Sequence, residues 1–384
     1  MNLYFDNAAT SFPKPQQVSE AVLNYMVNIG TNPGRGAYSA ALDADRLVYK
    51  TREVVAEFFN FSKPENVVFT MNVTHALNIL IKGVIKPHWH VITTTMEHNS
   101  VLRPLTTLKK SLDFDLDILP CSAEGLLDIN IFEKSIKQTT RLVILSQASN
   151  IVGTIQQIEA IGKICRTKGI YLIVDGAQSS GAIPVDFKAL NCSALCFTGH
   201  KSLLGPQGIG GFLIEDKLNE ETSTLYEGGT GSSSQSLEQP DFLPDKFECG
   251  TLNSPGIVGL LAGINYINSI GLLTIMQTEE YLTNYFIENL LNIKNITVLG
   301  PKAGLKKTSV ISIKHSSIEC AELSFLLSNN YNIMTRSGLH CAPLAHKTIG
   351  TFPSGTTRFS FGIFNTKVDI DYLLDSINCI SKNV

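Results

Sequence analysis

The chain has 384 residues, of which 43% are hydrophobic and 17% are charged, and its formal net charge is −3 at pH 7. This length predicts one large domain with a smaller companion, and the small net charge argues against a nucleic-acid or anionic-membrane partner. The N-terminus lacks a basic stretch followed by an apolar core, and no run approaches about 18 uncharged apolar residues, so we expect a cytoplasmic protein whose eight cysteines stay reduced.

The first half of the chain alternates helical and strand patterns. Apolar residues recur at helical spacing from Val18 to Ile29 and again from Leu47 to Phe58. Six short apolar runs then predict strands at residues 67–69, 90–94, 142–145, 171–174, 194–197 and 211–214. These runs are continuously hydrophobic, which is typical of strands covered on both faces. We therefore predict an α/β fold with a large, doubly wound, mostly parallel sheet.

The pattern changes after the last of these strands. Residues 227–255 show little periodicity and include the run GGTGSSS, so we predict a long loop that is mobile or functional. Beyond it, helical patterns at 257–267 and 281–293, strand patterns at 310–313 and 357–363, and a last helix from about residue 369 predict a smaller α+β domain. We place the large domain at 16–255 and the small domain at 256–384, together with the N-terminal arm 1–15.

Two predicted strands end in reactive side chains. The strand 171–174 runs into Asp175, and the strand 194–197 runs into residues 198–201, which end in Lys201. Ligands of open α/β sheets sit at the carboxyl ends of strands. An acid and a lysine there predict pyridoxal 5′-phosphate (PLP), because the lysine forms a Schiff base and the carboxylate keeps the pyridine nitrogen protonated. Taken singly, Asp175 would be explained equally well as a helix N-cap and Lys201 as a surface charge.

Rival motifs are absent: the sequence contains no Gly-x-Gly-x-x-Gly, no Walker loop, no His-Glu-x-x-His and no Gly-x-Ser-x-Gly. We interpret Cys192 and Cys196 as core residues. We interpret His88 and His90 as a loop and the start of a strand, because no third ligand lies nearby. No metal site is predicted.

Eight short motifs follow one another along nearly the whole chain. They are YFDNAAT (4–10), MEHN (96–99), SNIVGT (149–154), VDGAQ (174–178), TGHK (198–201), ECGTLN (248–253), RSGLHC (336–341) and TRFS (357–360). With these motifs the chain resembles the class V aminotransferase-like branch of fold-type-I PLP-dependent transferases, and within it the cysteine desulfurases and selenocysteine lyases. Each motif alone is weak, but eight in the same order are specific.

The resemblance implies roles for residues of these motifs. Lys201 would hold PLP and later shuttle the substrate's α-proton, Asp175 would pair with the pyridinium nitrogen, and His98 would stack on the ring. Further cofactor contacts are implied for Gln178, Asn150, Thr74, Thr198, His200 and, in the other subunit of a homodimer, Thr251. Arg358 would clamp the substrate carboxylate with two parallel hydrogen bonds, with Asn150 and Arg336 beside it.

Cys341 decides the reaction that the resemblance implies. In the desulfurases a thiolate at this position attacks the sulfur of L-cysteine, which gives L-alanine and an enzyme persulfide for a sulfur-acceptor protein. A free thiol has a pKa of about 8.5 unless a cation lowers it, and we expect His340 and Arg336 to be the neighbours that do so.

Three alternatives stay open: a selenocysteine lyase, another class V PLP reaction (amino transfer, epimerisation or β-elimination), and a non-catalytic protein that binds a partner. Cys341, which precedes the carboxylate-binding Arg358, argues against the second alternative, because those reactions need no thiol at this position. The retained Lys201, Asp175, His98, Gln178 and Arg358 argue against the third.

The chain departs from the family pattern at three positions. Val73 and His75 flank Thr74 where a small residue and a glutamate are usual, so we expect a narrower phosphate site with a different charge. Leu339 stands where the sulfur-mobilising branch often has a second histidine, which bears on the activation of Cys341. His346 follows shortly after, and we interpret it as a structural or surface residue.

Overall fold

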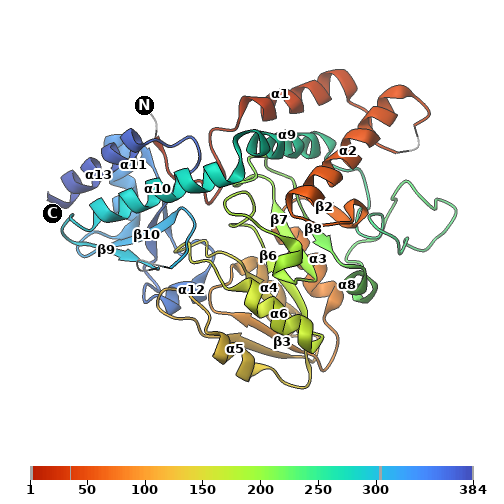
Figure 1. Cartoon of the computed structure of the whole chain (residues 1–384), viewed down its shortest axis with the longest axis horizontal. Coiled ribbons are helices and arrows are strands. Elements are labelled where there is room, and N and C mark those ends of the chain that lie inside the picture. The colour runs from red at the N-terminus through yellow and green to blue at the C-terminus, as the bar shows by residue number, and fades with distance from the viewer. Residues whose placement is uncertain (1–2, 35, 302–304, 383–384) are drawn as a thin grey trace.

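The computed structural model describes residues 3–34, 36–301 and 305–382. Its centre is a seven-stranded sheet (Figure 1). The strand order is β2 (Val67–Thr70), β8 (Gly210–Ile214), β7 (Ala194–Thr198), β6 (Tyr171–Asp175), β5 (Thr140–Ser146), β3 (His90–Thr94) and β4 (Asp115–Leu119). Strand β8 runs antiparallel to β2 and β7, and the other neighbours are parallel. The predicted α/β fold with a mostly parallel sheet is confirmed.

All six predicted strands of this sheet are present, and the structure adds the edge strand β4. Strand β4 escaped prediction because Asp115 and Asp117 interrupt its apolar residues, and only Leu119 is buried. Strand β5 illustrates the continuous runs, since Val143 and Leu145 point into one core while Leu142 and Ile144 point into the other.

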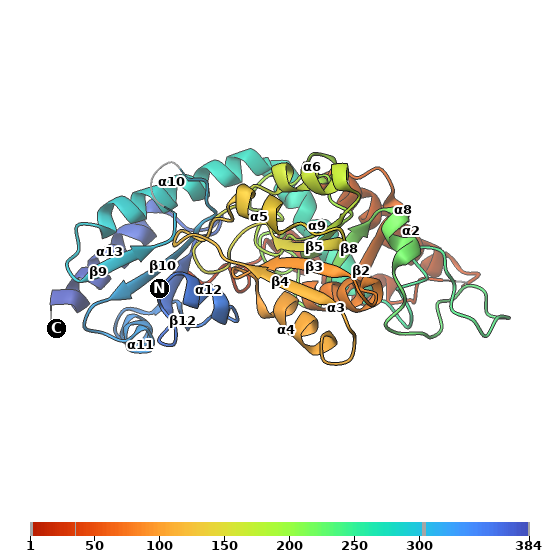
Figure 2. The ribbon, with the colours of Figure 1, turned by 90° about the horizontal axis from the view of Figure 1, so that it is seen from below.

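Helices cover both faces of the sheet, as Figure 2 shows for α3 and α4 on one side and α5 and α6 on the other. The helices that build these layers are α2 (Ser39–Phe58), α3 (Val73–Val84), α4 (Asn99–Leu108), α5 (Ile129–Ser135), α6 (Ile158–Lys168) and α9 (Ser254–Ile270). Shorter elements in this part are α1 (Gln16–Asn24), the π-helical turn Tyr25–Ile29, which ends where the predicted helical pattern ends, α7 (Phe187–Leu190) and α8 (Asp216–Glu221).

A four-stranded antiparallel sheet, with helices packed on it, lies at one end of the molecule (Figures 1 and 2). Its order is β12 (Arg336–Gly338), β13 (Thr356–Ser360), β10 (Val310–His315) and β9 (Ile296–Leu299). Helices α10 (Leu272–Leu290), α11 (Cys320–Tyr331) and α13 (Lys367–Lys382) share its core, and α12 (Pro343–Thr348) lies beside it. The N-terminal strand β1 (Leu3–Tyr4) pairs with β11 (Ile333–Met334), which joins the arm to this part.

The start of one predicted helix in this region differs from the structure. Helix α10 begins at Leu272 directly after Gly271, not at residue 281. The boundary between residues 255 and 256 stays a prediction, and Ile257, Leu260 and Ile264 of α9 lie in a core of the large sheet, which favours a boundary beyond α9. Among the described residues no single helix is both long and apolar enough to cross a membrane; α9 and α10 meet the two conditions only together, as a pair bent by 79°.

Residues 222–253 form no helix or strand, but several contacts attach them to the body. The strongest is a buried ion pair, in which the Arg52 Nη2 lies 2.5 Å from the Glu248 Oε2 and the Arg52 Nη1 lies 2.8 Å from Oε1. Glu248 Oε1 also accepts from the Phe69 amide of β2 at 2.6 Å. The ion pair therefore fixes the segment that carries Thr251, while the mobility of residues 227–255 as a whole stays a prediction.

We expect the substitution Glu248→Ala to lower the free energy of unfolding by about 3–5 kcal/mol, because it leaves the Arg52 guanidinium buried without its partner. Urea unfolding of the cofactor-free protein measures the change. The exposed pair of Lys50 with Glu53 is the matched control, and Glu53→Ala should change stability by less than about 0.5 kcal/mol. Equal effects of both substitutions would contradict the role given to the buried pair.

Candidate active site

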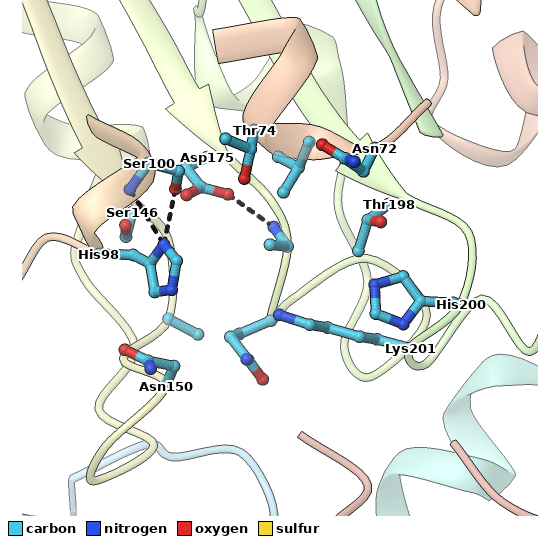
Figure 3. A pocket seen from close by; sticks show the side chains of 14 residues that line it. Asn72, Thr74, His98, Ser100, Ser146, Asn150, Asp175, Thr198, His200 and Lys201 are labelled. Carbon is cyan, nitrogen blue, oxygen red and sulfur yellow. Dashed lines mark hydrogen bonds between the residues drawn. The ribbon is translucent and has the colours of Figure 1, made fainter. Parts of the chain in front are cut away.

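A cavity of about 310 Å³ opens at the carboxyl ends of β5, β6 and β7 (Figure 3). Its lining residues are Asn72, Val73, Thr74, His98, Ser100, Ser146, Ala148, Asn150, Asp175, Ala177, Gln178, Thr198, His200 and Lys201. Eight of the predicted cofactor residues thus surround one space, although their individual roles stay predictions. Thr251 does not line the cavity and is exposed.

Parallel strands explain why Asp175 and Lys201 meet. Asp175 ends β6, and Lys201 follows the neighbouring strand β7 by three residues. Burial lowers the pKa of Lys201 to about 8, against the opposing effect of the Asp175 carboxylate. Burial raises the pKa of Asp175, but the Ala177 amide donates to Oδ1 at 2.9 Å and, with Lys201, favours the charged form. The cavity therefore holds an amine that loses its proton readily beside a buried carboxyl.

His98 stands on the opposite side of the cavity from His200 in Figure 3. Its Nδ1 accepts from the Ser100 amide at 3.1 Å, so this nitrogen carries no proton. Burial, with the nearby Lys201 charge, lowers the pKa of His98 to about 4, and the ring is neutral near pH 7. A neutral, fixed imidazole is suited to stack on a flat ring.

A second buried carboxyl, that of Glu97, lies next to His98 in the chain, and the sequence analysis gave it no role. Glu97 is 1% exposed and accepts from the Ser146 amide and hydroxyl at 2.8 and 2.7 Å and from the Thr94 hydroxyl at 2.6 Å. Burial raises the pKa of Glu97 to about 7. Glu97 fixes Ser146, the cavity residue that pairs in register with Asp175.

The other end of the cavity offers groups for an anion. Thr74 lies in the first turn of α3, where backbone N–H groups and the helix dipole favour negative charge, and the N-cap Asn72 already binds the His75 amide at 3.0 Å. The Thr198 hydroxyl and the His200 Nδ1 are buried, and neither has a hydrogen-bond partner within the described chain. Groups that can bind a phosphate, the neutral His98 ring and a lysine–carboxyl pair line one cavity, and this set of side chains fits the chemistry of PLP.

One of the two Nε2 hydrogens of Gln178 is used within the protein, because Nε2 donates to the Ala8 carbonyl at 3.0 Å. This contact attaches the N-terminal motif to the cavity wall. The second hydrogen on Nε2 remains for the cofactor contact that the resemblance implies for Gln178.

Cys341 lies at the rim of the cavity, in a turn attached to two site segments. The Asn150 Nδ2 donates to the His340 carbonyl at 2.8 Å, and the Asn99 amide donates to the Cys341 carbonyl at 2.8 Å. Cys341 is exposed. The backbone of the turn is therefore attached to the cavity residue Asn150 and to Asn99, which follows His98, and the Cys341 side chain is accessible to solvent.

One predicted role is wrong. Burial lowers the pKa of His340 to about 2, so this imidazole is neutral at working pH and supplies no positive charge to the Cys341 thiol. The sequence could not reveal this, because His340 is largely shielded from water although its neighbour Cys341 is exposed.

The two predicted substrate arginines share one carboxylate, which the sequence analysis missed. The Arg358 Nη2 donates to the Asp6 Oδ1 at 2.8 Å, and the half-exposed Arg336 Nε donates to Oδ2 at 2.9 Å. The Arg358 Nη1 donates to the Asn150 carbonyl at 2.9 Å, so Arg358 lies directly behind the cavity wall. Its buried Nε has no partner within the described residues, which leaves Nε and the second Nη2 hydrogen for a carboxylate. The acid in the motif YFDNAAT was the available signal.

The remaining histidine and cysteine candidates have structural surroundings. His90 is buried between Thr140 and Asp117, and Cys192 and Cys196 lie in the cores. No group of three or more His, Cys, Asp or Glu side chains that could hold a metal occurs in the part of the chain that the structure describes. His346 is buried, not at the surface.

Comparisons with known proteins agree with this geometry. The family model of class-V aminotransferases matches residues 3–373. A probable cysteine desulfurase of Methanothermobacter thermautotrophicus is 33% identical over 99% of this chain and 95% of its own length. A probable cysteine desulfurase of Pyrococcus abyssi is 34% identical over 100% and 95%. The solved cysteine desulfurase of Thermococcus onnurineus NA1 is 33% identical and superposes with a TM-score of 0.94, covering 100% of this chain and 95% of that one.

Proposed function

Because this chain belongs to the class-V aminotransferase family, whose members depend on PLP, we propose that it is a cysteine desulfurase that binds this cofactor on Lys201. It converts L-cysteine to L-alanine and takes up the substrate sulfur on Cys341 as a persulfide. The observation that carries the proposal is the attachment of the Cys341 turn to Asn150 and Asn99, at the rim of the cavity that contains Lys201 and Asp175.

When bound in this cavity, PLP supplies an electron sink for negative charge at the substrate's α-carbon. The protein's own groups do the rest. Asp175 balances the positive charge of the pyridine nitrogen, His98 covers the ring, and Thr74, Thr198 and His200 hold the phosphate. The substrate carboxylate binds to Arg358 through Nε and Nη2, and Asp6 keeps the guanidinium in place.

Lys201 and Cys341 move the protons and the sulfur. Lys201 removes the α-proton as a neutral amine, a form that burial makes accessible near pH 8. The Cys341 thiolate forms an S–S bond with the substrate sulfur while the Cβ–S bond breaks, and the electron pair of that bond stays with the substrate carbon. Protonation of this carbon and return of the proton from Lys201 to the α-carbon give alanine. A reducing thiol or an acceptor protein then removes the sulfur from Cys341.

We also propose a homodimer, which the exposed position of Thr251 supports. Glu248 fixes the segment that carries Thr251, yet this residue lies outside the cavity of its own chain. A second copy that receives Thr251 at its phosphate site would explain the fixed but exposed position.

The test of the proposed function is product analysis with the PLP-loaded protein. L-Cysteine should yield alanine and sulfide in equal amounts when a reducing thiol is present, and the lysine-bound cofactor should give its near-ultraviolet or visible absorption band. L-Selenocysteine is assayed in parallel as the competing substrate. Bound cofactor without alanine from either substrate, but with racemised or deaminated amino acid, would replace the proposal by another class V reaction.

Capture of PLP by the cofactor-free protein should depend on pH. The neutral Lys201 amine is the nucleophile, and its lowered pKa predicts a capture rate that rises between about pH 7 and 9 and levels off above about pH 9. Stopped-flow absorbance measures the rate, and Nα-acetyl-lysine, whose amine has a pKa of about 10.4, is the control for the ionisation of PLP itself. A protein rate that follows the control up to about pH 10 would contradict a buried, low-pKa Lys201.

A further inference from the structure

The turn that carries Cys341 has an unusual backbone. His340 and Cys341 are consecutive residues other than glycine, and both have positive φ, +46° and +59°. For residues other than glycine, this left-handed backbone conformation is less stable than the right-handed one. Strained residues of this kind persist only where the surrounding structure over-determines them. Contacts on more than one side must therefore hold the turn.

On the cavity side, the holding contacts are those of Asn99 and Asn150 already described. On the other side lies helix α12. The His346 amide of α12 donates to the Ala342 carbonyl at 3.2 Å, and the His346 ring lies 5.7 Å from the His340 ring, centroid to centroid, tilted by 36°. The Thr348 hydroxyl of α12 bonds to the Thr95 hydroxyl at 2.8 Å, which fixes the helix to the segment that precedes His98.

His346 is well fixed. Its side chain is 0% exposed, and its Nδ1 lies 2.7 Å from the Thr351 hydroxyl. Its carbonyl accepts from the amides of Thr351 and Phe352 at 2.8 and 3.2 Å. The ring is therefore a rigid support, held by the loop that follows α12.

The ring of His340 is fixed as well, and its tautomer can be assigned. Its Nε2 lies 3.2 Å from both the carbonyl and the hydroxyl oxygen of Thr356, and that hydroxyl donates its hydrogen to Ser312. Thr356 therefore offers only acceptors, and the His340 Nε2 carries the hydrogen. With His340 held by Thr356 and His346 held by Thr351, the two facing rings fix the side of the turn that faces away from the cavity.

We infer that His346 is a positioning residue for sulfur transfer: its buried ring, held by Thr351, supports His340 and so keeps the Cys341 thiol in place at the rim of the cavity. The inference rests on the proposed function. His346 does not line the cofactor cavity, so its effect falls on the step that uses Cys341 and not on the cofactor. Burial keeps both imidazoles neutral, with pKa values lowered to about 2 for His340 and about 4 for His346, so the support is geometric and not electrostatic.

The test compares two reactions of the same cofactor site. Desulfuration of L-cysteine needs Cys341, whereas elimination from β-chloro-L-alanine does not, because chloride leaves without a nucleophile. His346→Leu should lower kcat for desulfuration by about 10- to 100-fold and leave chloride elimination and the cofactor absorption band unchanged. His346→Asn, whose amide can replace Nδ1 toward Thr351, should recover most of the loss. His315→Leu removes a buried histidine from β10 and is the matched control with unchanged rates.

A second readout does not depend on catalysis. In the cofactor-free protein, hydrogen exchange of the Ala342 amide, which bonds to the Leu339 carbonyl at 2.9 Å, should be faster in His346→Leu than in wild type or in His315→Leu. If His346→Leu does not fold, His346→Gln replaces it, because the longer side chain carries its amide to the position of Nε2 and not of Nδ1.

Each outcome has one meaning. An equal fall in both reactions, loss of the cofactor band, or unchanged desulfuration together with unchanged exchange would overturn the positioning role. Absence of desulfuration in the wild-type protein would instead refute the proposed function, while the exchange comparison would still decide whether His346 holds the turn.

Discussion

Substitution of Lys201 by alanine is expected to abolish turnover of L-cysteine, with a fall of about 10⁴-fold or more, since it removes both the covalent attachment of the cofactor and the group that moves the α-proton. The side chain lines a cavity in which burial lowers its pKa to about 8, and among the described residues Lys201 is the one lysine of that lining. Within that part of the chain no other lining side chain can substitute for the amine. The loss is measured as alanine formed per enzyme, together with the absorption band of lysine-bound PLP.

Lys188 provides the control for the loss of a lysine. It is exposed on α7, and Lys188→Ala should retain both the band and the activity. A Lys201→Ala protein that keeps the lysine-type absorption band would mean that another amine carries the cofactor, and the assignment of Lys201 would be withdrawn.

Substitution of Cys341 by alanine is expected to lower alanine formation from L-cysteine by about 10³-fold or more, while cofactor binding and chloride elimination from β-chloro-L-alanine persist. The reason is that Cys341 is the only cysteine of the motif RSGLHC and lies in the turn attached to Asn150. Without a thiol at the rim of the cavity, no group accepts the sulfur as the Cβ–S bond breaks. Mass spectrometry of the wild-type protein after one turnover should find one extra sulfur atom on the peptide that contains Cys341.

Cys379 is the matched control, because it is also exposed but lies on α13, in the C-terminal helix. Cys379→Ala should turn over L-cysteine at the wild-type rate. Equal alanine from wild type and Cys341→Ala would show that the Cys341 thiol is not the acceptor, and another thiol, such as a second cysteine or the added reducing thiol, would then take up the sulfur.

The candidate site was predictable where its residues follow strands. Asp175 ends one continuous apolar run and Lys201 follows the next by three residues, and parallel neighbouring strands bring their carboxyl ends together whatever the rest of the chain does. Asp6 was missed for the opposite reason. Asp6 reaches Arg358 through the pairing of the N-terminal arm with strands more than 300 residues away, and no local pattern encodes that contact.

The sequence by itself determined the strands and their burial on both faces, because hydrophobic periodicity is a property of neighbouring residues and survives without knowledge of partners. It also determined the order of the motifs and therefore the chemistry they resemble. Only the tertiary structure decided the charge of His340, the shared carboxylate of Arg336 and Arg358, and the buried position of His346. These properties depend on desolvation and on contacts between segments far apart in the chain, and both arise only in the folded protein.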